Sequence, residues 1–95
     1  MIDFYSKPSY GFEDLRKLVQ VLRAPDGCPW DRVQTHSSIR RNFIEEVYEA
    51  CEAIDNGDTD GLREELGDVL LHVVFHAGIE EDAGRFTIDD VCEPW

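Results

Sequence analysis

The sequence has few basic residues for its length. Nine lysines and arginines stand against 21 aspartates and glutamates in 95 residues, which gives a formal net charge of −12. Binding to a polymeric nucleic acid or to an anionic membrane needs clustered cations, so this composition disfavours both partners. A small phosphate ligand is still compatible with it, because a bound divalent cation can reverse the local charge.

Cysteines and long apolar runs are also scarce, and their scarcity excludes further classes of protein. Cys28, Cys51 and Cys92 form neither a CxxC pair nor a Cys/His zinc pattern. We therefore expect reduced thiols, with Cys28 and Cys51 as small buried apolar side chains and not as nucleophiles. The sequence has no run of 18 apolar residues and no signal or transit peptide, so we expect a soluble cytoplasmic protein.

What the sequence does contain is helical periodicity within one small domain, residues 1–95. Apolar residues recur three or four positions apart and predict helices over residues 11–23, 38–55 and about 58–83. The segment "LGDVLLHVVFHAGI" in the third helix is apolar on most sides, which predicts a central position or a subunit contact. These helices predict an all-α domain, and because so short a chain buries a modest core, we expect oligomerisation to complete it.

Helix-capping and helix-breaking residues predict where these helices begin and end. The run from Thr35 to Ser38 offers N-caps for the second helix, which Gly57 ends. Gly84 ends the third helix, and Thr87 begins a last one in capping-box spacing. The segment "APDGCPWDRVQTH" between the first two helices concentrates proline and glycine, so we expect an ordered loop there.

Four acidic residues are placed symmetrically about the predicted turn at Gly57. A tight turn makes the two helices antiparallel neighbours, so residues equally far from Gly57 in the sequence lie at the same height. Glu46 is then level with Asp68, and Glu49 is level with Glu65. Each helix presents its own two acids on one face, because they are three positions apart.

Two interpretations of these acids are open. Acidic side chains on helices are commonly solvated surface, which is the better interpretation for any one of them taken alone. Four carboxylates at two matched levels, however, repel one another unless a cation lies among them. Oxygen ligands without a Cys or His framework favour Mg²⁺ or Mn²⁺ over zinc, and Mg²⁺ leaves positions for water and phosphate oxygens.

The acidic pattern, EExxE at 45–49 and ExxD at 65–68, resembles the MazG family of nucleoside triphosphate pyrophosphohydrolases. The segments "LRAPDGCPWDRVQTH", "EAIDNGD", "LREELGDVLLHVVFHA" and "GRFTIDDV" resemble it too, so the likeness extends from about residue 11 to residue 91. It implies an all-α antiparallel helical bundle, assembled as a homodimer or homotetramer. It also implies that the protein hydrolyses a nucleoside triphosphate substrate to the monophosphate and pyrophosphate, with Mg²⁺ as cofactor and Mn²⁺ as a substitute.

The resemblance also implies roles for individual acids. Glu46, Glu49, Glu65 and Asp68 match the metal-binding positions of the family motif. Glu45, Glu46 and Glu49 are the candidate catalytic residues, with Glu45 as a carboxylate that orients water or supports a metal ligand. The implied reaction is attack of a metal-activated water on the α phosphorus.

The candidate substrate-binding residues are Arg40, Arg41 and Trp30. Arg40 falls where the family has a basic residue before the EExxE helix, and Arg41 and Arg32 lie close to it in the sequence. Such cations suit a triphosphate, although salt bridges to the surplus acids are the preferred interpretation for Arg41 and Arg32. Trp30 either stacks on a base or, as is more common for an aromatic residue in such a loop, fills the core.

Two further features leave alternatives open. His72 and His76 lie four apart, which is compatible with zinc ligands but more typical of hydrogen-bonded core histidines, because HxxxH here lacks the glutamate of HExxH. In the family that the sequence resembles, a further helix with basic residues follows "DDV", whereas this sequence ends "DDVCEPW". We therefore expect a last helix cut short, and the alternative function is a catalytically impaired, metal-binding helical module for dimerisation or interaction.

Overall fold

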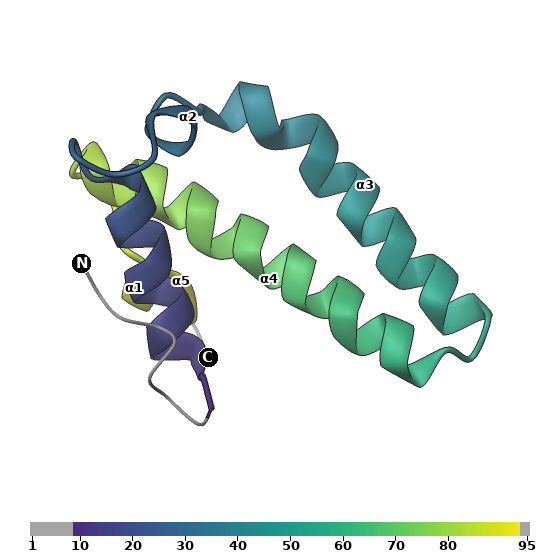
Figure 1. Ribbon diagram of the computed structural model, residues 1–95. Helices are drawn as coiled ribbons and strands as arrows, with labels where there is room; N and C mark the ends of the chain where they lie inside the picture. The colour runs from purple at the N-terminus through teal and green to yellow at the C-terminus, as the bar shows by residue number, and fades with distance from the viewer. Residues whose placement is uncertain (1–8, 94–95) are drawn as a thin grey trace.

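The computed structural model describes residues 9–93, and over that range the chain is all-α, as predicted (Figure 1). Residues 1–8 and 94–95 of the predicted domain, including the chain end where we expect a shortened last helix, lie outside the described residues. In chain order the helices are α1 (Phe12–Arg23), α2 (Pro29–Arg32), α3 (His36–Asp55), α4 (Thr59–Asp82) and α5 (Ile88–Cys92).

The predicted helix boundaries are confirmed to within two residues, and local hydrogen bonds explain them. Thr35 caps α3, because its hydroxyl accepts from the Ser38 amide at 3.1 Å. Asp58 caps α4 by accepting from the amide of Gly61 at 2.9 Å. Gly57 and Gly84 have positive φ angles of 63° and 72°, which glycine adopts without steric cost at helix ends.

One short helix was not predicted. The segment that we expected to be an ordered loop contains the single turn α2, which begins at Pro29. Proline is well placed at the first position of a helix, because the amide that it lacks would have no partner there. The prediction of a continuous loop was therefore wrong over Pro29–Arg32, since proline breaks a helix interior but starts a helix readily.

Helix α4 is central, as its apolar sequence predicted. It forms a hairpin with α3, and α1 and α5 pack against its C-terminal half (Figure 1). The core there consists of Val19 from α1, Val74, Phe75 and Ala77 from α4, and Ile88 from α5. Val19 is only 1% exposed, and burial of such side chains holds the short helices α1 and α5 in place.

Two predicted core residues are not in the core. Trp30 is 74% exposed, so the expectation that it fills the core was wrong. Cys51 is also exposed and Cys28 is only partly buried, so the expectation of two buried thiols fails for Cys51. All three cysteines are free, as expected. Composition alone does not show which side of a helix its neighbours cover.

One side of the α3–α4 hairpin leaves apolar side chains uncovered. We call it the apolar hairpin face. It is made of Ile44, Val47, Ile54, Leu66 and Leu70, which are between 39% and 60% exposed. On a helical wheel, Leu70 lies about 200° round α4 from Asp68, so this face points away from the acids. Within residues 9–93, no helix has a stretch both long and apolar enough to cross a membrane.

Candidate metal centre

Three of the four predicted metal-binding acids converge between α3 and α4. Glu46 and Glu49 come from α3 and Glu65 from α4, and one carboxylate oxygen of each lies within 4.8 Å of the other two. The level predicted from Gly57 is confirmed for Glu49 and Glu65, whose carboxylate oxygens lie within 4.8 Å of each other. We call these three residues the acid cluster.

The acid cluster contains oxygens without partners. Oε2 of Glu46 and Oε2 of Glu65 are shielded from solvent and accept no hydrogen bond. A shielded polar atom without a partner costs free energy, and a carboxylate oxygen costs more because of its charge. Within residues 9–93, none of the ion pairs formed by Lys or Arg includes these acids or Asp68. The described residues therefore do not neutralise the cluster.

The pKa values of the cluster show the same lack of positive charge. The pKa of Glu65 rises from 4.5 to about 7, mainly through its hydrogen bond with Glu49 and then through burial and repulsion by Glu49 and Glu46. Burial, followed by the charges of Glu49 and Asp68, raises the pKa of Glu46 as well. Oxygen donors that hold protons for want of a cation are a fitting ligand set for Mg²⁺ or Mn²⁺.

Asp68 and Glu45 lie at the margin of the cluster. Asp68 is exposed one turn along α4 from Glu65 and is not among the three converging carboxylates, although its charge reaches Glu46. Glu45 points elsewhere and accepts from Nε of Arg41 at 3.2 Å in an exposed ion pair. For Arg41, this salt bridge is the interpretation that the sequence favoured.

The other predicted substrate-binding residues are not in contact with the cluster. Arg40 is exposed and lies about 120° round α3 from Glu46. Arg32 donates to the backbone oxygen of Pro25 and so supports the turn before α2. Trp30 borders a separate pocket between α2, α3 and α4. The structure therefore brings the acids together but leaves the predicted phosphate-binding arginines on the surface.

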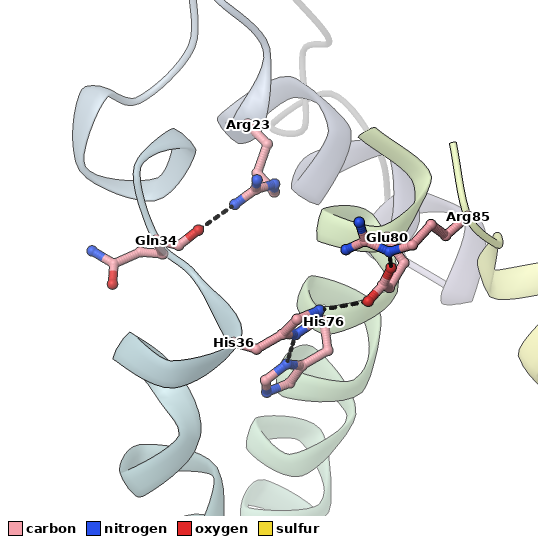
Figure 2. Close-up of polar contacts among 6 residues, drawn as sticks. All are labelled: Arg23, Gln34, His36, His76, Glu80 and Arg85. Carbon is pink, nitrogen blue, oxygen red and sulfur yellow. Dashed lines mark hydrogen bonds and ion pairs between the residues drawn. The ribbon is translucent and has the colours of Figure 1, made fainter. Parts of the chain in front are cut away.

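A histidine network joins the start of α3 to the end of α4 (Figure 2). Nδ1 of His36 lies 2.7 Å from Nδ1 of His76, and the rings stack with centroids 4.9 Å apart. Nε2 of His36 lies 2.8 Å from Oε1 of Glu80, and Oε2 of Glu80 pairs with Nε of Arg85. His36 was missed because it begins a helix 40 residues from its partner, and no periodicity links the two positions.

The carboxylate of Glu80 fixes one proton position in the network. The carboxylate of Glu80 can only accept, and the pKa of Glu80 is lowered first by Arg85 and then by His36. Nε2–H of His36 therefore donates to Glu80, and the facing Nδ1 atoms of His36 and His76 share one proton between them in a second hydrogen bond. Burial lowers the pKa of His76, which keeps it neutral. His76 is thus hydrogen-bonded through Nδ1, whereas Nε2 of His76 and Nδ1 of the neighbouring His72 are shielded and have no partner.

Comparison with known proteins matches the part of the chain that carries the acids. A family described as the MazG nucleotide pyrophosphohydrolase domain matches residues 34–94. The chain is 56% identical over 80 residues to the nucleoside triphosphate pyrophosphohydrolase/pyrophosphatase MazG of Thermotoga maritima, covering 84% of this chain and 31% of that protein.

Two further relatives show the same partial coverage. The nucleoside triphosphate pyrophosphohydrolase of Escherichia coli K12 is 47% identical over 79 residues, which are 82% of this chain and 30% of that protein. The uncharacterised protein YabN of Bacillus subtilis is 59% identical over 82 residues, 86% of this chain and 17% of that protein. The chain thus spans less than a third of the length of each of these relatives.

Proposed function

The chain belongs to the family of MazG nucleotide pyrophosphohydrolase domains, and from this we propose that it hydrolyses nucleoside triphosphates to monophosphates and pyrophosphate. The observation that carries the proposal is the convergence of Glu46, Glu49 and Glu65, with shielded oxygens that have no partner. Asp68, one turn from Glu65, would complete the ligand set. Relatives with this domain are named nucleoside triphosphate pyrophosphohydrolases, which supports the reaction class.

The acid cluster would hold Mg²⁺, with Mn²⁺ as a substitute. When bound, the metal supplies an activated water and neutralises charge on the phosphates. The carboxylates alone repel a triphosphate, so they bind it only together with divalent cations. Glu46 and Glu49 are carried on a rigid helix and already lie within a few ångströms of Glu65. They therefore need little rearrangement to act as ligands.

The exposed residues Glu45, Arg40 and Arg41 can take part in the reaction only if their side chains move toward the acid cluster. Glu45 could orient water only after its ion pair with Arg41 opens, and this pair is exposed and therefore weak. Arg40 and Arg41 remain the proposed ligands of the outer phosphates. Both are exposed near the first turns of α3, where long side chains can reorient freely.

The test of the reaction is the identity of its products. The protein incubated with Mg²⁺ and each of the eight common NTPs and dNTPs is expected to release pyrophosphate and the monophosphate, and to stop when EDTA is added. Release of orthophosphate would contradict the proposed bond cleavage. Binding of Mg²⁺ and nucleotide with no turnover would favour the alternative function, a metal-binding interaction module.

We also propose that the chain forms at least a homodimer through the apolar hairpin face. Large apolar side chains that lie together on one side of two helices are typical of a protein contact. Ile54 in the last turn of α3 and Leu66 in the first half of α4 are 60% and 53% exposed. Helices α1 and α5 pack against the other half of α4 (Figure 1). A second copy can cover this face with the same residues, as a twofold contact requires.

Replacing Leu66 by aspartate is therefore expected to convert the oligomer to a monomer. A charge in the contact would have to be buried without a partner, which strongly disfavours association. Light scattering coupled to size exclusion measures the mass. The control is Val33→Asp, which changes a 66% exposed apolar residue just after α2, outside the apolar hairpin face. Equal masses for both variants and the unmodified protein would contradict this interface.

A further inference from the structure

The side chain of His36 joins the open end of α3 to α4 (Figure 2). Its Nδ1 lies 2.7 Å from Nδ1 of His76, and its Nε2 lies 2.8 Å from Oε1 of Glu80. His36 is the first residue of α3, whereas His76 and Glu80 lie in the last two turns of α4. We call these three residues the histidine latch. It holds the end of the hairpin that lies opposite the turn at Gly57 (Figure 1).

The geometry of the histidine latch limits how many protons it can hold. Because Nε2–H of His36 donates to Glu80, the two facing Nδ1 atoms share one proton when both rings are neutral. One added proton turns His36 into an imidazolium that donates to His76 and to Glu80, so both hydrogen bonds persist. A second added proton leaves two N–H groups and two positive charges facing each other across 2.7 Å. The contact cannot survive this second proton.

The surroundings of His76 also disfavour its protonated form. Its Nε2 is shielded from solvent and has no partner, so a proton there would have no acceptor. Burial, followed by the charges of His36 and His72, lowers the pKa of His76 from its ordinary value of 6.5. A group whose pKa is lowered by folding favours the fold while it is neutral. The contribution of His76 is therefore lost as the pH falls below 6.5.

The other end of the histidine latch accommodates a positive charge. Arg85 pairs with Oε2 of Glu80 and leaves Oε1 to accept from His36. Arg85 and then His36 lower the pKa of Glu80, so this carboxylate stays ionised in mild acid. An ionised Glu80 stabilises an imidazolium at His36. The state with one added proton, placed on His36, is therefore compatible with a closed latch.

The charged groups on the neighbouring helices have other partners or lie in solvent. On α1, Arg23 pairs with Asp82. On α5, Asp90 caps its own helix, and on α3, Arg40 is exposed one turn after His36. Within residues 9–93, no charged group outside the latch except the neighbouring histidine on α4 shifts the pKa of its buried member. The latch therefore responds mainly to its own protons.

The histidine latch also supports the next contact between α3 and α4. The ring of Phe43 packs against the rings of His72 and His76, with centroids 5.5 and 5.1 Å apart. Phe43 lies two turns after His36 on α3, between the latch and the acid cluster. Movement of His76 away from His36 would therefore loosen the first turns of α3. The turn at Gly57 holds the opposite end of this helix and is not affected.

We propose that the histidine latch is a proton-operated device. It keeps the open end of α3 against α4 while its two imidazoles hold at most one added proton, and it releases α3 when both are charged. Release loosens the two helices that carry the acid cluster relative to each other, without unfolding the turn end of the hairpin. The inference does not depend on the proposed reaction, because none of the members of the latch belongs to the acid cluster.

Nuclear magnetic resonance of the protein with ¹⁵N-labelled histidine, in EDTA, tests this proposal. The spin coupling between the two nitrogens of an N–H···N bond reports the shared proton directly. We expect this coupling between the Nδ1 atoms of His36 and His76 at pH 8. It should persist in the state with one added proton and disappear at lower pH, while circular dichroism shows that the helices remain. A coupling that is absent at pH 8, or that lasts until the helices unfold, would overturn the latch.

Hydrogen exchange measures the release of α3. The amides of residues 40–43 lie in the second turn of α3, just beyond the histidine latch. Their protection factors should fall by about tenfold per pH unit once the latch opens, which is the slope for uptake of one proton. The protection factors of residues 51–54, close to the turn at Gly57, should not show this fall. Equal pH profiles for the two segments would contradict a local release.

Two variants with matched controls assign the response to the histidine latch. His76→Asn keeps an amide that can bond to His36 but does not titrate, so the protection of residues 40–43 should become largely independent of pH. The control His72→Asn removes a neighbouring imidazole outside the latch and should keep the tenfold slope. The same slope in His76→Asn would overturn the proposal.

The second variant serves as well where His76→Asn melts too low for exchange to be measured. Glu80→Gln removes the ionised partner of the His36 imidazolium, so the fall in protection should move to higher pH. Glu81→Gln removes the same charge from the adjacent position on α4, which lines a separate cavity with α1, and should leave the profile in place. Identical profiles for Glu80→Gln and Glu81→Gln would refute the latch.

Discussion

Replacing Glu65 by glutamine is expected to abolish Mg²⁺-dependent pyrophosphate release and, in the absence of metal, to make the protein more stable. Glutamine keeps the size and a hydrogen-bonding oxygen but removes one charge from three converging carboxylates. Loss of a ligand from a metal site should reduce activity by about 100-fold or more. Opposite effects on activity and on stability distinguish a functional acid from a structural one.

The gain in stability should depend on pH in a defined window. The pKa of Glu65 is about 7 in the folded chain, compared with an ordinary value of 4.5. A raised pKa means that this group favours folding while it is protonated, and that its contribution is lost as the pH rises through about 7. Glutamine does not titrate. The difference in unfolding free energy between Glu65→Gln and the unmodified protein should therefore grow between pH 4.5 and 7 and then level off.

Chemical denaturation in EDTA at pH 5 and pH 8 measures this difference, and excess Mg²⁺ at pH 8 should raise the stability of the unmodified protein but not that of Glu65→Gln. The matched control is Glu64→Gln, which removes the same charge from the adjacent exposed position on α4. The control should keep its activity and its response to Mg²⁺. A Glu65→Gln protein that is less stable than the unmodified one at pH 8, or fully active, would contradict the metal centre.

Replacing Arg23 by alanine is expected to lower the unfolding free energy by about 2 to 3 kcal/mol, because hydrogen bonds from a charged group are among the strongest. The side chain of Arg23 is only 9% exposed and pairs with Asp82 at 3.0 Å. It also donates to the carbonyls of Asp31 at 3.0 Å and Gln34 at 3.4 Å, the latter shown in Figure 2. Its guanidinium lies 5.1 Å from the centre of the Phe75 ring. One side chain thus joins α1, the α2 segment and α4.

The melting temperature should consequently fall by roughly 10 °C or more for a domain of this size. Circular dichroism measures it. Arg41→Ala is the control, since Arg41 makes an exposed ion pair with Glu45 that should contribute about 0.5 kcal/mol. Arg23→Lys keeps the charge but not the planar, branched donor, and should recover only part of the loss. Equal melting temperatures for Arg23→Ala and Arg41→Ala would show that the contacts of Arg23 do not stabilise the packing of α1, the α2 segment and α4.

Most of the acid cluster was predictable from the sequence because its geometry is local. A single turn at Gly57 sets the register of α3 against α4, so equal sequence distances place Glu49 beside Glu65. Asp68 was predicted as a full partner but remains exposed, outside the converging three. Counting from a turn gives the height of a residue on each helix, whereas the separation of the helices at that height depends on the side chains packed between them.

The surface residues were predicted less well, for a related reason. The family motif places Arg40 before the acids in the sequence but does not show which way its side chain points. On the helical wheel of α3, Arg40 lies about 120° from Glu46. Trp30 was expected in the core, yet the core is filled by Val19, Phe75 and Ile88, and the ring of Trp30 stays in solvent. Whether an aromatic residue in a loop is buried depends on what else fills the space beneath it.

The sequence by itself determined every described helix except the single turn α2, together with the caps of α3 and α4 and the family, because these depend on contacts between residues at most a few positions apart or on a motif spanning one turn. The tertiary structure alone decided the pairs that are far apart in the chain. His36 meets His76 across 40 residues, and Arg23 meets Asp82 across 59. Such pairs form only when packing of the apolar side chains of α1 and α3 against α4 brings their helices together, and no local spacing encodes that packing.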